Sequence, residues 1–384
     1  MSDFILQENG NHLQSETGSG IGIDIPWLTG WDKRIEITVS NTNIDSNLTH
    51  FPLLLTLGIS VGTGNDDVSA VFDELTSDDN RKKIAVTKSD AMTQIYVEIE
   101  RWDDANEQAW LWVSKSDLTL SSSGTTTLYL YYDSTQDDNT TYVADAGSRT
   151  EVWDSNYMAV WHLGESSGDA IDSTSNNHDG TFVGSLPDAK PGKIGYAQDF
   201  DNSGDYITAD SVASEISTNG AWSYYAWFNS SATSGDTHVD QLISYHQNTS
   251  NILRIAIPPT NYILFYDDDT NSPDQDIGFG ENYADGQWHQ MVATRESGSG
   301  NKTLYVYIDG SQEATGSANP TLSNANQFSI GQEWDSGPTP SDFFYGLISE
   351  LRISNIQRPA AWVKASYYSE EDNLVSWGSE EIFS

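Results

Sequence analysis

Two acidic residues, Glu98 and Glu100, have the spacing that would place a pair of catalytic carboxylates on one β-strand. Side chains at positions i and i+2 of a strand point to the same face of the sheet. Glycoside hydrolases use two carboxyl groups, one as the acid and one as the nucleophile or base. Because the chain has 57 Asp and Glu residues, a pair at this spacing is expected by chance. We therefore predict no catalytic residues and a protein that is not an enzyme.

The other residue types that commonly carry catalysis form no recognisable motif. There is no Cys, which excludes disulfide bonds, thiolate nucleophiles and cysteine-based zinc sites. The 7 His residues show no His-Glu-x-x-His spacing, and no Gly-x-Ser-x-Gly nucleophile turn occurs. No glycine-rich loop follows a predicted strand and opens a helix, so nucleotide binding is not supported.

The chain is strongly acidic, with 17 Lys and Arg against 57 Asp and Glu and a formal net charge of −40. Such a charge repels phosphate backbones and anionic membrane surfaces, so we exclude nucleic acid as a partner. It fits either a solvated acidic surface in salty water or carboxylates that hold Ca²⁺. The longest apolar run, residues 51–59, has the length of a strand, and no membrane insertion is expected. Residues 1–10 lack the basic and apolar regions of a secretory signal peptide.

The elements that would position any site are β-strands. Residues 34–39 alternate apolar and polar side chains, and residues 51–57 form a nearly continuous apolar run. Further strands are predicted at 83–88, 93–102, 109–114 and 125–132, and a second series at 221–230, 241–245, 252–257, 262–266, 288–295, 302–308, 327–331 and 345–354. Only residues 359–368 have a helical pattern, with Pro359 at its start. We predict an all-β protein with an N-terminal arm (residues 1–25) and two β-sandwich domains (residues 26–145 and 146–384).

Seven short motifs in the second half resemble a laminin-G-like jelly roll of the concanavalin-A-like class. In chain order they are the segments 161–165, 172–181, 195–201, 222–227, 286–290, 304–310 and 346–354. One of them ends in Asp309-Gly310, a strong signal for a tight hairpin turn. The resemblance implies that the C-terminal domain is a concanavalin-A-like jelly roll. It also implies that His162 and His289, each next to a family Trp, are packed strand residues.

Laminin-G-like jelly rolls often hold a structural calcium ion between an Asp- and Asn-containing loop and an acid from the last long strand. The resemblance therefore implies calcium as a cofactor, with Asp172, Asn177 and Glu350 as its ligands. Carboxylate and amide oxygens are the donors that Ca²⁺ prefers. The residues alone leave an alternative, in which Asp172 and Asn177 cap the loop as Asx turns and Glu350 forms a salt bridge.

The first half is similar to a family of unassigned function that often stands beside laminin-G-like domains in bacterial and archaeal surface proteins. The matching segments are 30–34, 48–54, 97–102, 109–113 and 128–132. That family continues with Tyr-Tyr-Gly-Asn, whereas this chain has Tyr132-Asp133-Ser134 near the domain boundary. The resemblance implies no chemistry for the first domain. Residues 4–10 are similar to the start of many structural proteins of tailed phages.

Aromatic and polar side chains outside the expected core are candidates for glycan binding. Sugars stack on aromatic faces, while amides and charged groups fix their hydroxyls. The candidates are Tyr245, Arg254, Tyr262, Tyr266, Asp267 and Trp334. Trp334 is the best placed, because it stands between Glu333 and Asp335 in a turn-rich segment. The alternative for each Trp and Tyr is a place in the core of the sandwich.

Together these features predict a non-enzymatic binding or structural protein on a surface, with a glycan or host polysaccharide as its partner. The first interpretation is a virion structural or host-attachment protein, because a virion protein needs no export signal. Its N-terminal arm would contact other virion or surface proteins, and the chain would form a homo-oligomer. The alternatives are an extracellular adhesin of bacteria or archaea, and a polysaccharide-degrading enzyme or its carbohydrate-binding module.

Overall fold

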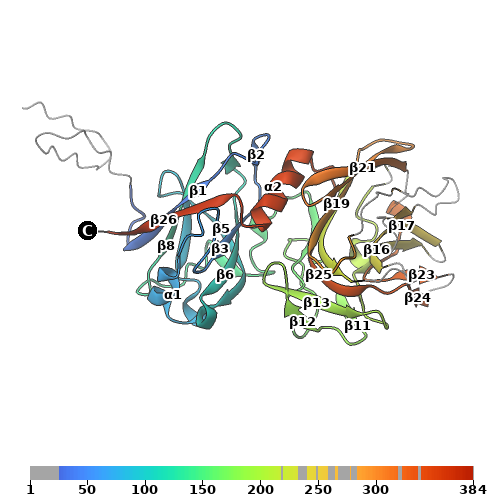
Figure 1. Cartoon of the computed structure of the whole chain (residues 1–384), viewed down its shortest axis with the longest axis horizontal. Helices are drawn as coiled ribbons and strands as arrows, with labels where there is room; N and C mark the ends of the chain where they lie inside the picture. The colour runs from blue at the N-terminus through green and yellow to red at the C-terminus, as the bar shows by residue number, and fades with distance from the viewer. Residues whose placement is uncertain are drawn as a thin grey trace, which may run out of the picture.

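Two β-sheet assemblies lie side by side along the longest axis of the molecule in a computed structural model of the chain (Figure 1). The structure describes residues 26–217, 219–231, 240–247, 250–257, 264–266, 277, 283–318, 322–335 and 339–383. The predicted N-terminal arm, residues 1–25, lies outside the described residues. Strands dominate both assemblies, which confirms the prediction of an all-β protein.

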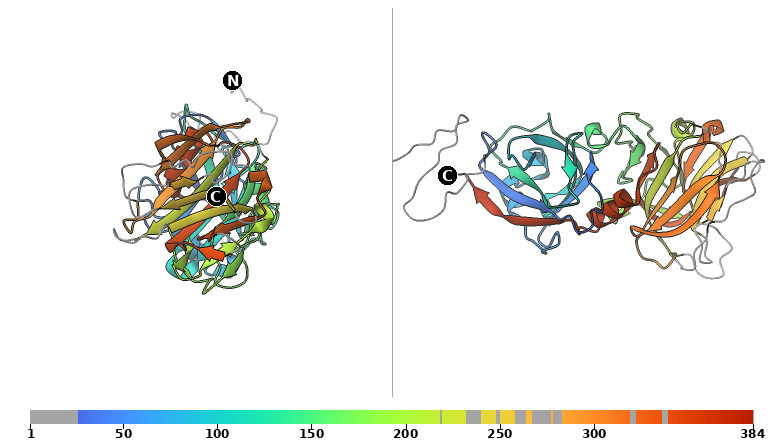
Figure 2. Two further views of the ribbon diagram at one scale, coloured as in Figure 1. Left: turned by 90° about the vertical axis from the view of Figure 1, so that its right-hand side faces the viewer. Right: turned by 90° about the horizontal axis from the view of Figure 1, so that it is seen from above.

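The first assembly is one eight-stranded sheet that curls around its own core (Figure 2). Its order is β26-β1-β8-β4-β5-β6-β3, and β9 pairs in parallel with β5. The strands are β1 (Lys33–Val39), β3 (Leu53–Leu57), β4 (Ile84–Lys88), β5 (Gln94–Asp103), β6 (Gln108–Ser114), β8 (Thr126–Tyr132), β9 (Val143–Asp145) and β26 (Val375–Ile382), with the separate pair β2 (Leu48–Thr49) and β7 (Thr119–Leu120). Alternate residues of β1, such as Ile35, Ile37 and Val39, enter the core, as their period of two predicts.

The second assembly is a sandwich of two facing sheets. One has the order β12-β13-β25-β15-β19-β20-β21, with β10 on β25, and the other has the order β11-β14-β22-β16-β17-β18. The strands are β10 (Tyr157–Trp161), β11 (Thr181–Val183), β12 (Ala189–Pro191), β13 (Tyr196–Asp201), β14 (Tyr206–Thr208), β15 (Trp222–Ser230), β16 (Asp240–Gln247), β17 (Ser250–Ile257), β18 (Leu264–Tyr266), β19 (His289–Arg295), β20 (Lys302–Ile308), β21 (Ser311–Ala318), β22 (Gln327–Ile330) and β25 (Tyr345–Ser354), with the hairpin β23 (Glu333–Asp335) and β24 (Thr339–Ser341). Large side chains such as Trp161, Phe200, Trp222 and Phe328 fill the space between the sheets.

The helix α2 (Ala360–Glu370) lies between the two assemblies (Figure 1; Figure 2). Its Trp362 and Ala365 belong to the core of the first assembly, whereas Val363 packs with Trp227 of the second. The helix predicted at residues 359–368 is confirmed. The remaining helical segments are α1 (Ala70–Leu75) and the 3-10 turns η1 (Asp78–Asn80), η2 (Asp104–Asn106), η3 (Thr150–Val152), η4 (Asp210–Val212) and η5 (Leu322–Asn324). No helix in the described part of the chain has the length and apolar character needed to cross a membrane.

The last strand changes the expected extent of the two domains. β26 pairs antiparallel with β1, from Lys33 opposite Ile382 to Val39 opposite Val375. Residues 375–382 therefore belong to the first sheet, although the sequence placed them in the domain of residues 146–384. The pairing covers the backbone of β1, which would otherwise be an open sheet edge.

Candidate functional site at the seam

The candidate site lies at the seam between the assemblies, where buried charged side chains from both sides meet. The strand β5 contributes two glutamates, and the residue after β10 is a histidine. The strand β25 contributes a glutamate and an arginine, and the helix α2 contributes one more glutamate. These residues are Glu98, Glu100, His162, Glu350, Arg352 and Glu370.

The pattern of β5 directs its two glutamates to the seam. Val97 and Ile99 enter the core of the first assembly, so Glu98 between them faces the other way. The pairing of β5 with β6 shifts register between Ile99 and Arg101, which leaves Glu100 as the extra residue of a β-bulge. A bulge re-aims a side chain and often occurs beside a functional site.

Glu350 also lies at a bulge. Ile348 and Leu351 both enter the jelly-roll core, and two residues instead of one separate them. The pairing of β15 with β25 shifts register at this point, and Glu350 has a φ of 55°, in the left-handed region that is unusual for a non-glycine residue. The bulge thereby turns Glu350 toward the same side as Arg352, where the two side chains form an ion pair of 2.6 Å.

His162 is the centre of the cluster. Its Nδ1 lies 2.7 Å from Oε1 of Glu350 and 3.5 Å from Oε2 of Glu100, and its Nε2 lies 3.7 Å from Oε2 of Glu98. Its ring stacks beside Trp112 with centroids 6.1 Å apart. The imidazole thus joins carboxylates from both assemblies.

Indole N–H groups hold three of the carboxylates in place. Trp112 donates to Glu100 at 2.7 Å, Trp153 donates to Glu98 at 2.6 Å, and Trp227 donates to Glu370 at 2.5 Å. The Arg352 guanidinium donates to Glu370 at 2.9 Å and lies over the Trp112 ring, 4.4 Å from its centroid. Each carboxylate is therefore both buried and hydrogen-bonded, as a buried charge requires.

The cluster holds more carboxylates than cationic groups, and this imbalance perturbs several pKa values. Burial raises the pKa of Glu100 well above its usual range, and the nearby carboxylate of Glu350 adds to the effect. Burial opposes a charge on His162, but Glu350 and Glu100 outweigh it and raise the pKa of the imidazole well above its ordinary value. Burial also opposes the charge on Glu350, yet His162 and Arg352 lower the pKa of that carboxyl. A charged group of His162, Glu350 and Arg352 thus lies beside a Glu100 that favours its protonated form.

A groove leads from this cluster to the surface, and we call it the seam groove. Its inner part is a cavity of about 300 Å³ whose lining includes Glu100, His162, Arg101, Tyr196, Glu165 and Ile171. Its outer part, of about 410 Å³, shares Glu100, Arg101 and Ala146 with the inner part and adds Trp102, Asp145 and Arg81. The Arg101 guanidinium lies over Tyr196, 3.9 Å from the ring centroid. Aromatic faces and charged groups in one concavity are typical of a ligand site.

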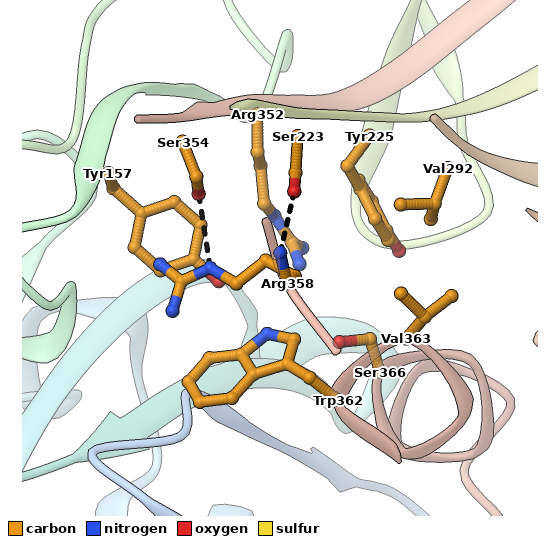
Figure 3. Close-up of a pocket in the computed structure, with 10 residues that line it drawn as sticks. All are labelled: Tyr157, Ser223, Tyr225, Val292, Arg352, Ser354, Arg358, Trp362, Val363 and Ser366. Atoms are coloured by element: carbon orange, nitrogen blue, oxygen red, sulfur yellow. Dashed lines mark hydrogen bonds between the residues drawn. The ribbon is translucent and has the colours of Figure 1, made fainter. Parts of the chain in front are cut away.

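A second, much smaller cavity lies between α2 and the strands of the jelly roll (Figure 3). Its volume of about 20 Å³ has room for one water molecule. Arg358 lies between the rings of Tyr157 and Trp362, 4.2 and 4.4 Å from their centroids (Figure 3). The same guanidinium forms two hydrogen bonds to Asp154. These contacts join the assemblies and leave no room for a larger ligand.

The structure places one of the predicted glycan-binding residues in the core. Tyr245 on β16 is fully buried and packs against Phe328 and Tyr224, with centroids 4.8 and 5.7 Å apart. The prediction that this ring contacts a sugar is therefore wrong, because the inner face of β16 is covered by the opposite sheet. Tyr262 and Asp267 lie outside the described residues.

Two other candidates, Arg254 and Trp334, lie near one another on the outer face of the six-stranded sheet. Arg254 of β17 forms an ion pair with Glu333, the residue before Trp334, and its backbone pairs with that of Tyr266 in β18. Trp334 packs edge-on against Tyr206, with centroids 6.2 Å apart, and is only 7% exposed. This patch lies apart from the residues that line the seam groove.

The three predicted calcium ligands each have protein partners. The carboxylate of Asp172 accepts four hydrogen bonds, from the backbone N–H groups of Val160, Thr174 and His178 and from the Thr174 hydroxyl, at 2.8 to 3.0 Å. Asn177 is exposed and donates to the carbonyl of its own loop at Ser175. These contacts match the loop-capping alternative for Asp172, and Glu350 faces His162 and Arg352 instead. The calcium site stays a prediction.

The sequence contained only part of the signal for the seam cluster. The spacing of Glu98 and Glu100 is also expected by chance in so acidic a chain, and the family resemblance implies only that His162 is a packed strand residue. His162 is indeed buried, yet its partner Glu350 is 188 residues away. The available clue was a pair of glutamates inside a strand whose neighbours Val97 and Ile99 are apolar.

Residues 201–364 match a laminin G family model described as the "Concanavalin A-like lectin/glucanases superfamily". The match covers less than half of the chain and runs from the end of β13 through β25 to the first residues of α2. It confirms the predicted concanavalin-A-like jelly roll in the C-terminal half. No curated protein sequence matches the chain.

Solved structures of several binding domains are similar to a little over half of the chain. Domain 4 of AbnA, a GH43 extracellular arabinanase from Geobacillus stearothermophilus in complex with arabinotriose, has a TM-score of 0.44 and 22% identity, over 54% of this chain and 97% of that chain. The binding domain of Paraclostridial Mosquitocidal Protein 1 has a TM-score of 0.44 and 14% identity, over 56% of this chain and 52% of that chain. The receptor binding domain of botulinum neurotoxin type G has a TM-score of 0.40 and 16% identity, over 56% and 51%. The alignments span about half of each toxin domain, and similarity at this level assigns no ligand to this chain.

Proposed function

We propose that the chain is a non-enzymatic glycan-binding protein displayed on a surface, and that the seam groove holds the glycan. The observation that supports this most directly is the groove itself, whose inner part has a volume of about 300 Å³ and both aromatic and charged walls. Sites for small ligands have volumes of roughly 300 to 1,000 Å³ and combine these two kinds of side chain.

The polar groups of the groove match the hydroxyls of a sugar. Tyr196 offers a ring on which the apolar face of a sugar can stack. Arg101 and Glu165 line the same cavity and offer a guanidinium and a carboxyl group. A hydroxyl group both donates and accepts, so the hydroxyls of a sugar can bond to both groups. Because the chain carries a net charge of −40, we expect a neutral glycan and not a polyanionic one.

We further propose that the surface is that of a virion, with the protein acting in attachment or as a structural component. An extracellular adhesin is the alternative. Mass spectrometry of purified virions and of cell-envelope fractions separates the two. Recovery of the chain in virions at a fixed copy number would support the first, and recovery only in the envelope would support the second.

Binding of the purified full chain to a panel of neutral polysaccharides tests the proposed site. Loss of the Tyr196 ring in Tyr196→Ala should weaken binding by about tenfold, which is the effect of a stacking contact of about 1.4 kcal/mol. Tyr345→Ala is the matched control, because Tyr345 is 47% exposed and does not line the groove. Equal affinity of Tyr196→Ala and the wild type would exclude the groove as the glycan site.

Hydrolysis of a glycan is the second candidate function, and the pair Glu100 and Glu350 favours it. Their surroundings push the two pKa values in opposite directions, as in the acid and nucleophile of a glycosidase. The geometry argues against it, because Glu350 has no exposed side chain and both of its oxygens contact His162 or Arg352. Release of reducing ends by the wild type, absent in Glu100→Gln, would establish an enzyme and overturn the non-enzymatic proposal.

A further inference from the structure

The floor of the seam groove brings together the side chains of a compact metal site. Glu100, His162 and Glu350 each offer one ligand atom, and the three atoms lie within 4.8 Å of one another. Their side chains are only 4, 5 and 0% exposed. This burial distinguishes the group from the many exposed acidic clusters that so acidic a chain must contain.

The charges around this group favour a bound cation. Glu98 and Glu370 are buried in the same cluster as Glu100 and Glu350, and Arg352 is the only guanidinium bonded to these carboxylates among the described residues. Carboxylates held away from water are costly unless cations lie close to them. A divalent ion between Glu100 and Glu350 would favour the ionised form of both carboxyl groups and balance their charge.

Each of the three side chains is oriented by a further contact, as the ligands in metal sites are. Trp112 donates to Oε2 of Glu100, and Arg352 donates to Oε2 of Glu350, which leaves Oε1 of Glu350 directed at His162. Histidines that bind a metal through one ring nitrogen usually point the other N–H at a carboxylate. Here Nδ1 faces Glu350 and Glu100, while Nε2 points toward Oε2 of Glu98, 3.7 Å away.

The free nitrogen of the histidine is an independent observation. Nε2 of His162 has no hydrogen-bond partner among the described residues, although the residue is only 4% exposed. A buried polar atom without a partner is costly and needs a reason. An ion on Nδ1 would place the proton on Nε2, and a small rotation of the ring would then bring this N–H within hydrogen-bond distance of Glu98.

We propose that Glu100, His162 and Glu350 bind a divalent transition-metal ion, for which zinc is the expected choice, with open coordination positions toward the seam groove. An imidazole ligand disfavours Ca²⁺ and Mg²⁺, which take oxygen donors, whereas Zn²⁺ readily accepts one histidine and two carboxylates. His162 and Glu100 line the inner cavity, so solvent or a ligand could complete the coordination. The site shares only Glu350 with the predicted calcium site, and it does not depend on glycan binding.

Titration of the full chain with zinc chloride tests this site after removal of bound metal with a chelator. Calorimetry should show one zinc ion per chain. His162→Gln and Glu100→Gln should remove most of the binding, and Glu98→Gln should weaken it by about 10- to 100-fold through the loss of its contact to His162. Glu74→Gln is the matched control and should bind zinc like the wild type, since this half-buried glutamate pairs with Lys33 away from the seam.

Two outcomes would overturn the proposal. One is that the wild type binds no zinc, and the other is that His162→Gln binds zinc as the wild type does. If the glutamine variants do not fold, X-ray absorption of the zinc-loaded wild type decides the question. A first shell of nitrogen and oxygen at about 2.0 to 2.2 Å supports the site, and a shell of oxygen alone contradicts it.

Discussion

We expect Asp372→Asn to stabilise the protein above pH 6 and to leave its stability unchanged at pH 4. Asp372 lies between α2 and β26, and its Oδ2 accepts a hydrogen bond of 2.5 Å from the backbone of Gly62. Burial raises the pKa of Asp372 to about 6, the Gly62 hydrogen bond opposes this, and the carboxylate of Asp66 adds to it. Asn keeps an oxygen for Gly62 and tolerates the φ of 57° at this position.

The sign and size of the effect follow from the raised pKa. A carboxyl that holds its proton more tightly in the folded chain makes the folded state less stable as the pH rises from 3.8 through about 6. At about 1.36 kcal/mol per pKa unit, the full difference is about 3 kcal/mol above pH 6. Because water reaches part of this side chain, we expect Asn to raise the free energy of unfolding by about 1 to 3 kcal/mol at pH 8.

Urea unfolding followed by tryptophan fluorescence at pH 4 and pH 8 measures this difference. Asp137→Asn is the matched control, because it removes the same charge from an exposed position. A gain in Asp372→Asn that is the same at both pH values would refute the titration argument. An equal gain in Asp137→Asn would instead assign the effect to the general repulsion of a chain with a net charge of −40.

Three further predictions concern the seam and the calcium loop. Arg352→Met should lower the free energy of unfolding in urea by about 3 to 5 kcal/mol, because it removes the guanidinium that pairs with both buried carboxylates, Glu350 and Glu370. The control Arg81→Met breaks a half-exposed ion pair and should cost at most about 1 kcal/mol, so equal losses would contradict the role of burial. The raised pKa of His162 gives a stabilisation that is complete below pH 6.5 and is lost as the pH rises through the folded value. Above pH 6.5 the melting midpoint should therefore fall less steeply with rising pH in His162→Gln than in the wild type. If the midpoints of the two proteins fall in parallel, titration of His162 does not contribute to stability. A bound calcium ion should raise the melting midpoint of the wild type over that in chelator, and Asp172→Ala should abolish the difference; equal midpoints would leave Asp172 with its capping role alone.

Local patterns in the sequence predicted the individual strands well. The strand predicted at residues 345–354 has these bounds in β25, and the one predicted at 34–39 differs from β1 by one residue. The strand β21 was missed because its sequence, SQEATGSA, is polar on both faces and has no apolar period. The pairing of β26 with β1 was missed for a different reason. Partners more than 300 residues apart leave no trace in a local pattern, and only tertiary packing selects them.

The candidate site was less predictable than the fold. The i, i+2 spacing of Glu98 and Glu100 predicts that they share one face of a strand. The sequence does not indicate that a second assembly covers this face. The bulges at Glu100 and Glu350 re-aim both side chains, and each bulge depends on the register of a neighbouring strand. His162 was correctly expected to be packed, although its surroundings are carboxylates and indoles and not an apolar core.

The contact between the assemblies has an aromatic region and a charged region, and their difference favours a functional role for the charged region. Near α2 the assemblies meet through aromatic rings, such as Phe51 against Trp362 with centroids 5.0 Å apart. Such packing would suffice to hold two domains together. Buried ion pairs add little net stability, and apolar residues of similar volume often serve better in their place. The carboxylates below the groove are therefore not needed to hold the assemblies together. Buried charges that add little stability are expected where a protein recognises a ligand. His162 lines the groove and contacts Glu350, while the neighbouring Leu351 enters the jelly-roll core, so a ligand in the groove would act on β25 through His162.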